Sequence, residues 1–223
     1  MARRPLSNTE NLLLVEGIND QHVCWQLFKY FALPDQLCQV EEGKGWENIR
    51  ESLPQRLKAG NQKRLGIVVD ADENIGSRWQ SLSNVLHKAG YSNVPSAPDT
   101  IGTIIRPAEV NEALEQPPFT TIVGIWIMPN NVLPGALEEF IRFLVPNGDE
   151  LWQVAQDTVL NLPGPDDFRS ANWQSKARLY SWLAWQQEPG KPIGQAIASR
   201  YLNPEVAEAR DFVNWVQRLF SSQ

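Results

Sequence analysis

The sequence predicts an α/β fold, in which a mainly parallel β-sheet is flanked by helices and followed by a helical extension. Between residues 11 and 89, short apolar runs alternate three times with segments of helical periodicity, as in chains that build parallel sheets. From residue 134 onward the strand-like runs stop, and the remaining segments are helical in character. We therefore expect residues 1–133 to form the α/β core and residues 134–223 to pack on it as a helical extension, in one compact unit.

The first half of the chain supplies the predicted sheet. The runs 12–15 and 65–69 contain only apolar residues and glycine, which is typical of strands buried on both faces. Pro54 lies inside the second predicted helix and predicts a kink or an early break there, because proline lacks the amide hydrogen. The predicted strands are 11–15, 36–41, 65–70, 101–105 and 120–128, and the predicted helices are 19–31, 46–58 and 77–89.

The second half of the chain supplies the predicted helical extension. In its central segment, Trp173, Ala177, Tyr180 and Ala184 fall on one stripe of a helix. The predicted helices are 135–144, 149–160, 171–186, 193–200 and 204–220.

Composition limits the class of protein. Hydrophobic residues make up 42% and charged residues 21% of the 223 residues, which is ordinary for a soluble globular protein. No run approaches the roughly 20 apolar residues of a membrane span, so we expect no membrane partner. The net charge of −6 disfavours a protein that binds nucleic acid through a basic surface. Two cysteines and the lack of a secretory segment fit the cytoplasm.

Acidic side chains follow the first and third predicted strands. Glu16 comes directly after the run 12–15, and Asp70 and Asp72 follow the run 65–69. Residues two apart in an extended chain point the same way, so Asp70 and Asp72 should face one region. The carboxyl ends of parallel strands share one edge of a sheet, where α/β proteins bind ligands. Carboxylates held together raise one another's pKa, and a hard cation such as Mg²⁺ or Mn²⁺ relieves that repulsion.

Other polar residues should lie near the same edge. Asp20 comes about one helical turn after Glu16, Asn74 follows the Asp-X-Asp segment, and Asn130 follows the last strand. Glu138 stands early in the next helix. Each also has a simpler interpretation, since Asp20 suits the positive end of a helix dipole and Glu138 suits an exposed helix surface.

The forms Val-Glu-Gly-X-X-Asp at 15–20 and Val-Val-Asp-Ala-Asp-X-Asn at 68–74 resemble the TOPRIM superfamily. That superfamily includes the metal-binding domains of topoisomerases, bacterial primases, recombination-repair proteins and OLD-family nucleases, and the similarity spans roughly residues 11–130. The stretches 128–138 and 176–197 look like a TOPRIM-related family of bacterial proteins nearest the OLD-type nucleases.

This resemblance implies a TOPRIM-like Rossmannoid core, a Mg²⁺ site and nuclease-like or phosphotransfer chemistry on nucleic acid or nucleotides. Asp70 and Asp72 would hold the metal, with Glu16 as a ligand or general acid/base. Glu138 would serve a second metal, and Lys176 would act at the phosphate. Asn130 departs from the pattern, because a neutral amide stands where an acid would assist a second metal.

Two other functions remain open from the sequence. A non-catalytic module could keep the metal pocket and bind RNA, DNA ends or nucleotides. A receiver-like signalling domain also gathers acids at strand ends, but only Glu16 closes the first strand and no lysine closes the last one.

Overall fold

The computed structural model describes residues 10–107, 120–164 and 169–221. Its centre is a five-stranded sheet with the spatial order β2-β1-β3-β5-β4. Four strands are parallel, and the edge strand β4 runs antiparallel to β5. The prediction of a mainly parallel α/β sheet is confirmed. The strands are β1 (Asn11–Val15), β2 (Gln39–Glu42), β3 (Arg64–Asp70), β4 (Thr103–Ile105) and β5 (Ile122–Met128).

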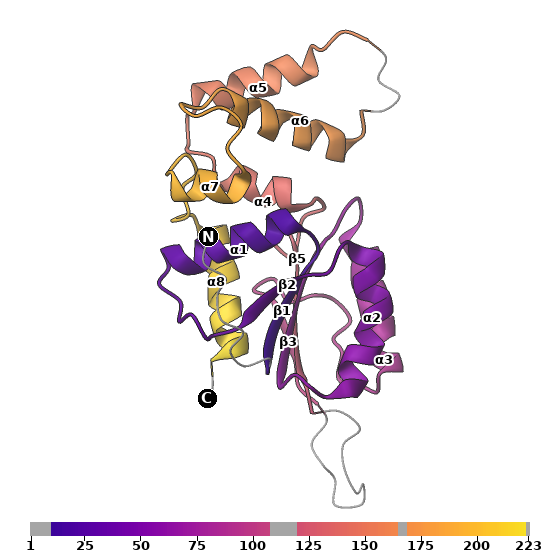
Figure 1. The fold of residues 1–223 in the computed structure, drawn as a ribbon. Coiled ribbons are helices and arrows are strands. Elements are labelled where there is room, and N and C mark those ends of the chain that lie inside the picture. The colour runs from indigo at the N-terminus through magenta and orange to yellow at the C-terminus, as the bar shows by residue number, and fades with distance from the viewer. Residues whose placement is uncertain (1–9, 108–119, 165–168, 222–223) are drawn as a thin grey trace, which may run out of the picture.

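Helices cover both faces of the sheet and one of its ends (Figure 1). Helices α1 (Ile18–Tyr30) and α8 (Ala207–Phe220) lie on one face, and α2 (Trp46–Ala59) and α3 (Ile75–Lys88) lie on the other. The other four helices lie beyond the carboxyl ends of the strands. They are α4 (Leu137–Leu144), α5 (Glu150–Leu160), α6 (Ala171–Ala184) and α7 (Ile193–Ala198).

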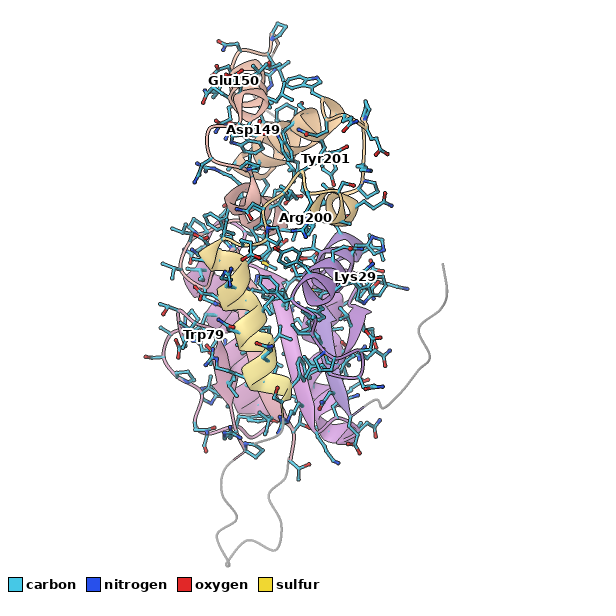
Figure 2. All side chains as sticks on the ribbon, turned by 90° about the vertical axis from the view of Figure 1, so that its left-hand side faces the viewer. Lys29, Trp79, Asp149, Glu150, Arg200 and Tyr201 are labelled. Carbon is cyan, nitrogen blue, oxygen red and sulfur yellow. The ribbon has the colours of Figure 1, made fainter. Side chains whose placement is uncertain are left out.

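Two apolar cores hold the layers together, because successive residues of each strand point to opposite faces. Leu13, Val15 and Trp126 join the core under α1 and α8. Leu14 and Ile67 join the core under α2 and α3. Helix α8, near the carboxyl end of the chain, runs along the sheet face (Figure 2). The boundary between residues 133 and 134 stays a prediction, although α8 of the extension packs on β3 and β5.

Several predicted boundaries were wrong. The first helix begins at Ile18, one residue before its predicted start, because Gly17 is its N-cap, and Asp20 lies inside its first turn. The second strand starts only at Gln39, since Leu37 donates its amide to Pro34 in a turn. Of the segment 101–105 only Thr103–Ile105 is a strand, because Gly102 has a positive φ of 89°.

The remaining differences concern helix ends. Pro54 does not end α2, which continues to Ala59. Helix α3 starts at Ile75, two residues early, because the Asn74 side chain accepts a hydrogen bond from the Ser77 amide and caps it. Helix α8 starts at Ala207 instead of residue 204.

No helix in the described part of the chain is both long enough and apolar enough to cross a membrane.

Gly124 allows close contact between β5 and α8. A Cβ atom at Gly124 would lie 2.4 Å from Cδ2 of Leu219, and Leu219 is only 1% exposed, so it has no free space to move into. We expect Gly124→Ala to lower the free energy of unfolding by about 1–3 kcal/mol through overpacking. Urea denaturation of Gly124→Ala, Leu219→Ala and the double variant measures this. The double variant should lose less free energy of unfolding than the two single variants lose together. Strict additivity of the two losses would contradict the proposed clash.

Candidate functional site

Glu16 and Asp70 lie side by side at the carboxyl edge of the sheet. Strands β1 and β3 are parallel neighbours, with Val15 paired to Val68, so the residues that follow emerge together. The Glu16 Oε2 atom accepts a hydrogen bond from the Asp70 amide at 3.1 Å. The Trp46 amide, at the start of α2, also donates to Glu16. These two amides fix the Glu16 carboxylate against the end of β3.

Asp20 contributes a deeply buried carboxylate to the same region. Its side chain is on the first turn of α1 and the residue is only 6% exposed. One oxygen, Oδ2, accepts a hydrogen bond from the Gly17 amide at 3.2 Å. The other oxygen, Oδ1, is buried and has no hydrogen-bond partner among the described residues, and the same holds for Oδ1 of Asp70. A buried oxygen without a hydrogen-bond partner lowers the stability of the folded state, and a bound ligand or a proton would remove that penalty.

Five carboxyl groups share this environment. Burial raises the pKa of Asp70 to about 9, and repulsion from Asp20, Glu16, Glu138 and Asp72 adds to the effect. Burial also raises the pKa of Asp20 to about 7, with further repulsion from Glu16 and Glu138. The pKa values of Glu16 and Glu138 are raised as well, chiefly by burial. The predicted convergence of acids from separate strand ends is therefore present in the fold.

Asp72 lies at the border of this acidic cluster, which consists of Glu16, Asp20, Asp70, Asp72 and Glu138. Its backbone has a positive φ of 53° and bridges to Gly135, so the strand geometry does not continue from Asp70 to Asp72. The Asp72 carboxylate forms an ion pair with Arg78 and accepts a hydrogen bond from Asn172 Nδ2 at 3.4 Å. The expectation that Asp70 and Asp72 both follow strand geometry was wrong, although repulsion from Asp72 still reaches Asp70.

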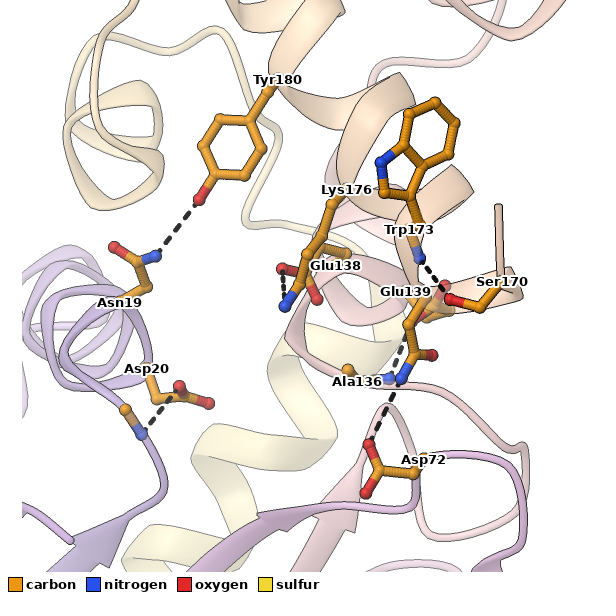
Figure 3. A network of polar contacts seen from close by, with 12 residues as sticks. Asn19, Asp20, Asp72, Ala136, Glu138, Glu139, Ser170, Trp173, Lys176 and Tyr180 are labelled. Atoms are coloured by element: carbon orange, nitrogen blue, oxygen red, sulfur yellow. Dashed lines mark hydrogen bonds and ion pairs between the residues drawn. The ribbon is translucent and has the colours of Figure 1, made fainter. Parts of the chain in front are cut away.

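Helix α6 faces the acidic cluster with three polar residues spaced four apart (Figure 3). Asn172 contacts Asp72, and Lys176 Nζ lies 3.9 Å from Glu138 Oε1. The hydroxyl group of Tyr180 accepts a hydrogen bond from Asn19 at 3.3 Å. Lys176 thus brings a cationic side chain from the extension close to a member of the acidic cluster.

Asn74 and Asn130, which we expected near the acidic edge of the sheet, form local hydrogen bonds with the backbone. Asn74 caps α3 with its Oδ1 atom, which accepts from the Ser77 amide at 2.9 Å. Asn130 Oδ1 accepts hydrogen bonds from the amides of Val132 and Leu133, at 3.3 and 2.9 Å. Both side-chain oxygens thus stabilise the local backbone.

Carboxylate oxygens are the ligands that Mg²⁺ and Mn²⁺ prefer. Within residues 10–107, 120–164 and 169–221, however, no group of three or more His, Cys, Asp or Glu side chains is arranged so that it could hold a metal ion. The donor chemistry of the acidic cluster suits a hard cation, but binding one requires carboxylates to rotate inward. For Asp72 this rotation means leaving Arg78.

Sequence reasoning missed Arg78 and Asn172. Arg78 is only 8% exposed, and its guanidinium lies 4.3 Å from the centre of the Trp46 ring. A lone arginine beside a helix stripe gives no sign that it will be buried against an acid six residues earlier. Asn172 comes from α6, which is about 100 residues away in the chain, and the sequence carries no signal for its contact with Asp72.

The raised pKa of Asp70 predicts how stability depends on pH. Its pKa is about 9 in the folded protein against an ordinary value of 3.8, so the folded state holds the proton over an interval in which the unfolded state has lost it. Stability should therefore fall as the pH rises from about 4 toward about 9. Thermal denaturation at pH 5, 7 and 8.5 with a chelator present checks this. A melting temperature that is constant or rises over this interval would contradict it.

Comparison with known proteins gives one match. Residues 10–221 match the family model described as protein of unknown function (DUF3226), which covers nearly the whole chain, so the chain belongs to this family. No curated protein and no solved structure matches the chain.

Proposed function

We propose that this DUF3226 protein binds Mg²⁺ or Mn²⁺ at its acidic cluster and acts on nucleic-acid phosphodiesters as a TOPRIM-like, nuclease-like protein. The observation that carries the proposal is the pair of buried, unpartnered oxygens, Asp20 Oδ1 and Asp70 Oδ1, within a group of five acids. The resemblance of Glu16 and the segment 70–72 to the TOPRIM pattern supports the same conclusion.

The energetics of the cluster favour a cation. Without one, Asp70 keeps its proton at neutral pH because burial and four neighbouring acids oppose its ionisation. A divalent cation would replace that proton and supply a partner to the buried oxygens of Asp20 and Asp70. We assign Asp70, Asp20 and Glu16 as the principal ligands, with Glu138 completing the set after side-chain rotation, while Asp72 stays paired with Arg78 and adds negative charge beside the site.

Each residue has a distinct role in the proposed reaction. When bound, the cation would polarise a phosphodiester oxygen and lower the pKa of an attacking water. Glu16, whose pKa is raised above its ordinary value chiefly by burial, is the candidate for proton transfer beside the cation. Lys176 is 59% exposed on α6 and reaches toward Glu138, so its ammonium group can attract and position a phosphate over the cluster.

A second function, a module that binds a cation and nucleic acid without cleaving it, is favoured by one observation. The Asn130 side chain is used in the turn after β5 and offers a neutral amide where a second metal would need an acid. The net charge of −6 also suits a weak, local contact with nucleic acid better than binding along an extended phosphate backbone.

Cleavage assays separate these two functions. Single-stranded, duplex and supercoiled DNA and single-stranded RNA are incubated with the protein in Mg²⁺, Mn²⁺ or chelator. We expect cation-dependent cleavage, and Lys176→Ala should reduce its rate about tenfold or more without changing Mn²⁺ affinity. The control is Lys88→Ala, at an exposed position on α3, which should leave the cleavage rate unchanged. Mn²⁺ binding with no cleavage of any substrate would support the module instead. The absence of any effect of either cation on tryptophan fluorescence or calorimetry would contradict both.

A further inference from the structure

A pocket of about 520 Å³ adjoins the acidic cluster on the side of α2 and α3. Asp72 belongs to both, because its carboxylate lines the pocket and its charge acts on Asp70. Trp46, Ser77, Arg78 and Ser81 line it from the two helices, and Asn172 lines it from α6. The volume lies in the range of about 300–1,000 Å³ that is typical of small-ligand sites.

The lining of the pocket suits a flat, uncharged ring system. The Trp46 ring is an aromatic surface with the Arg78 guanidinium over it, and both groups stack readily on nucleobases. The hydroxyl groups of Ser77 and Ser81 and the amide of Asn172 can hydrogen-bond to base edges. These neutral groups would read a base without requiring a charged ligand.

The charge balance argues against a phosphate inside the pocket. Asp72 and Glu73 both line it, and the guanidinium of Arg78 is already paired with Asp72. A phosphate would therefore meet more negative than free positive charge. A base would avoid this repulsion, and its own phosphate would lie toward the acidic cluster, where a bound cation would accept it.

We propose that this pocket, the Trp46–Arg78 pocket, holds the base of one unpaired nucleotide of a nucleic-acid strand whose phosphate lies at the acidic cluster. The proposal rests on the proposed function, which it deepens by naming a single strand as the substrate class. A base inside a duplex has its Watson–Crick edge paired and both faces stacked, and it cannot enter a pocket without leaving the helix, so the pocket selects for unpaired nucleotides.

The test fills the pocket with a larger side chain and measures how tightly the 223-residue chain binds a single strand. The probe is a fluorescein-labelled single-stranded DNA octamer, followed by fluorescence anisotropy in Ca²⁺, which also takes oxygen ligands. Ser81→Trp places a large side chain in the pocket and should weaken octamer binding about tenfold or more. Gln80→Trp adds the same side chain at the neighbouring, exposed position of α3, which does not line the pocket, and should change affinity less than about twofold.

A second variant keeps the proposal testable if Ser81→Trp fails to fold. Trp46→Leu keeps an apolar side chain but removes the aromatic stacking surface, and it should also weaken octamer binding about tenfold. A blunt duplex octamer and free AMP should both bind the wild type more weakly than the single strand. Wild-type affinity in folded Ser81→Trp and Trp46→Leu would overturn the proposal, and so would tighter binding of AMP or duplex than of the single strand.

Calorimetric titration with Mn²⁺ keeps the two proposals separable. If the wild type binds Mn²⁺ but no octamer, the pocket assignment fails while the cation site stands. If the octamer binds and Ser81→Trp weakens it, but Mn²⁺ does not bind, the pocket stands and the proposed cation site fails.

Discussion

Replacement of Asp70 by Asn is expected to reduce Mn²⁺ affinity about 100-fold or more, because it removes a central ligand whose loss should exceed that of a supporting group. The same change should stabilise the metal-free protein at pH 8. At that pH the folded protein keeps the Asp70 carboxyl group protonated, whereas the unfolded chain gains free energy by ionising it, and a neutral amide removes this penalty on the folded state. We expect a gain in melting temperature of about 5 °C, since 1 kcal/mol corresponds to roughly 2–4 °C in a protein of this size. Calorimetry with Mn²⁺ and thermal denaturation with a chelator measure the two effects.

Glu73→Gln is the matched control for Asp70→Asn. Glu73 is exposed in the same loop, and its replacement also removes one carboxylate, but it is not among the groups that repel Asp70. It should leave both Mn²⁺ affinity and melting temperature nearly unchanged. Equal losses of affinity in the two variants would mean that general charge, and not the buried carboxylate, attracts the cation.

Replacement of Phe212 by Ala is expected to lower the free energy of unfolding by about 3–5 kcal/mol, the usual cost of removing a large buried aromatic side chain. Phe212 lies on α8, is fully buried, and packs edge-on against Trp126 of β5 and Phe140 of α4, with ring centres 5.3 and 5.9 Å away. The change therefore opens a cavity where the sheet and the extension meet. Urea denaturation with tryptophan fluorescence measures it.

The control for Phe212→Ala is Leu160→Ala at the end of α5. Leu160 is also a large apolar residue of the extension, but it is 64% exposed, so its loss should change stability by less than about 0.5 kcal/mol. A two-step unfolding curve for the wild type, with Phe212→Ala affecting one step only, would contradict a shared core between sheet and extension.

Much of the fold was predictable because local pattern and tertiary structure agree. The apolar runs at 12–15 and 65–69 form the buried parts of β1 and β3, since a strand covered on both faces needs apolar residues along its covered length. The approach of Glu16 to Asp70 followed from parallel pairing alone. The antiparallel direction of β4 was not predictable, because a three-residue strand carries no directional signal.

The site was predictable only in its acidic part. Carboxylates at strand ends have a recognisable spacing, whereas the partners of Asp72 come from tertiary packing. Arg78 reaches Asp72 because α3 begins directly after the loop that carries Asp72, and Asn172 reaches it because α6 lies over the sheet end. The left-handed backbone conformation of Asp72 accompanies its bridge with Gly135, and no local sequence pattern predicts that bridge.

Crystals soaked in Mn²⁺ and measured at an anomalous wavelength test the central claim most directly. We expect one anomalous peak bonded to carboxylate oxygens of Asp70, Asp20 and Glu16, with Asp72 still paired with Arg78. Saturating Mn²⁺ that gives no anomalous peak at these carboxylates would contradict the claim.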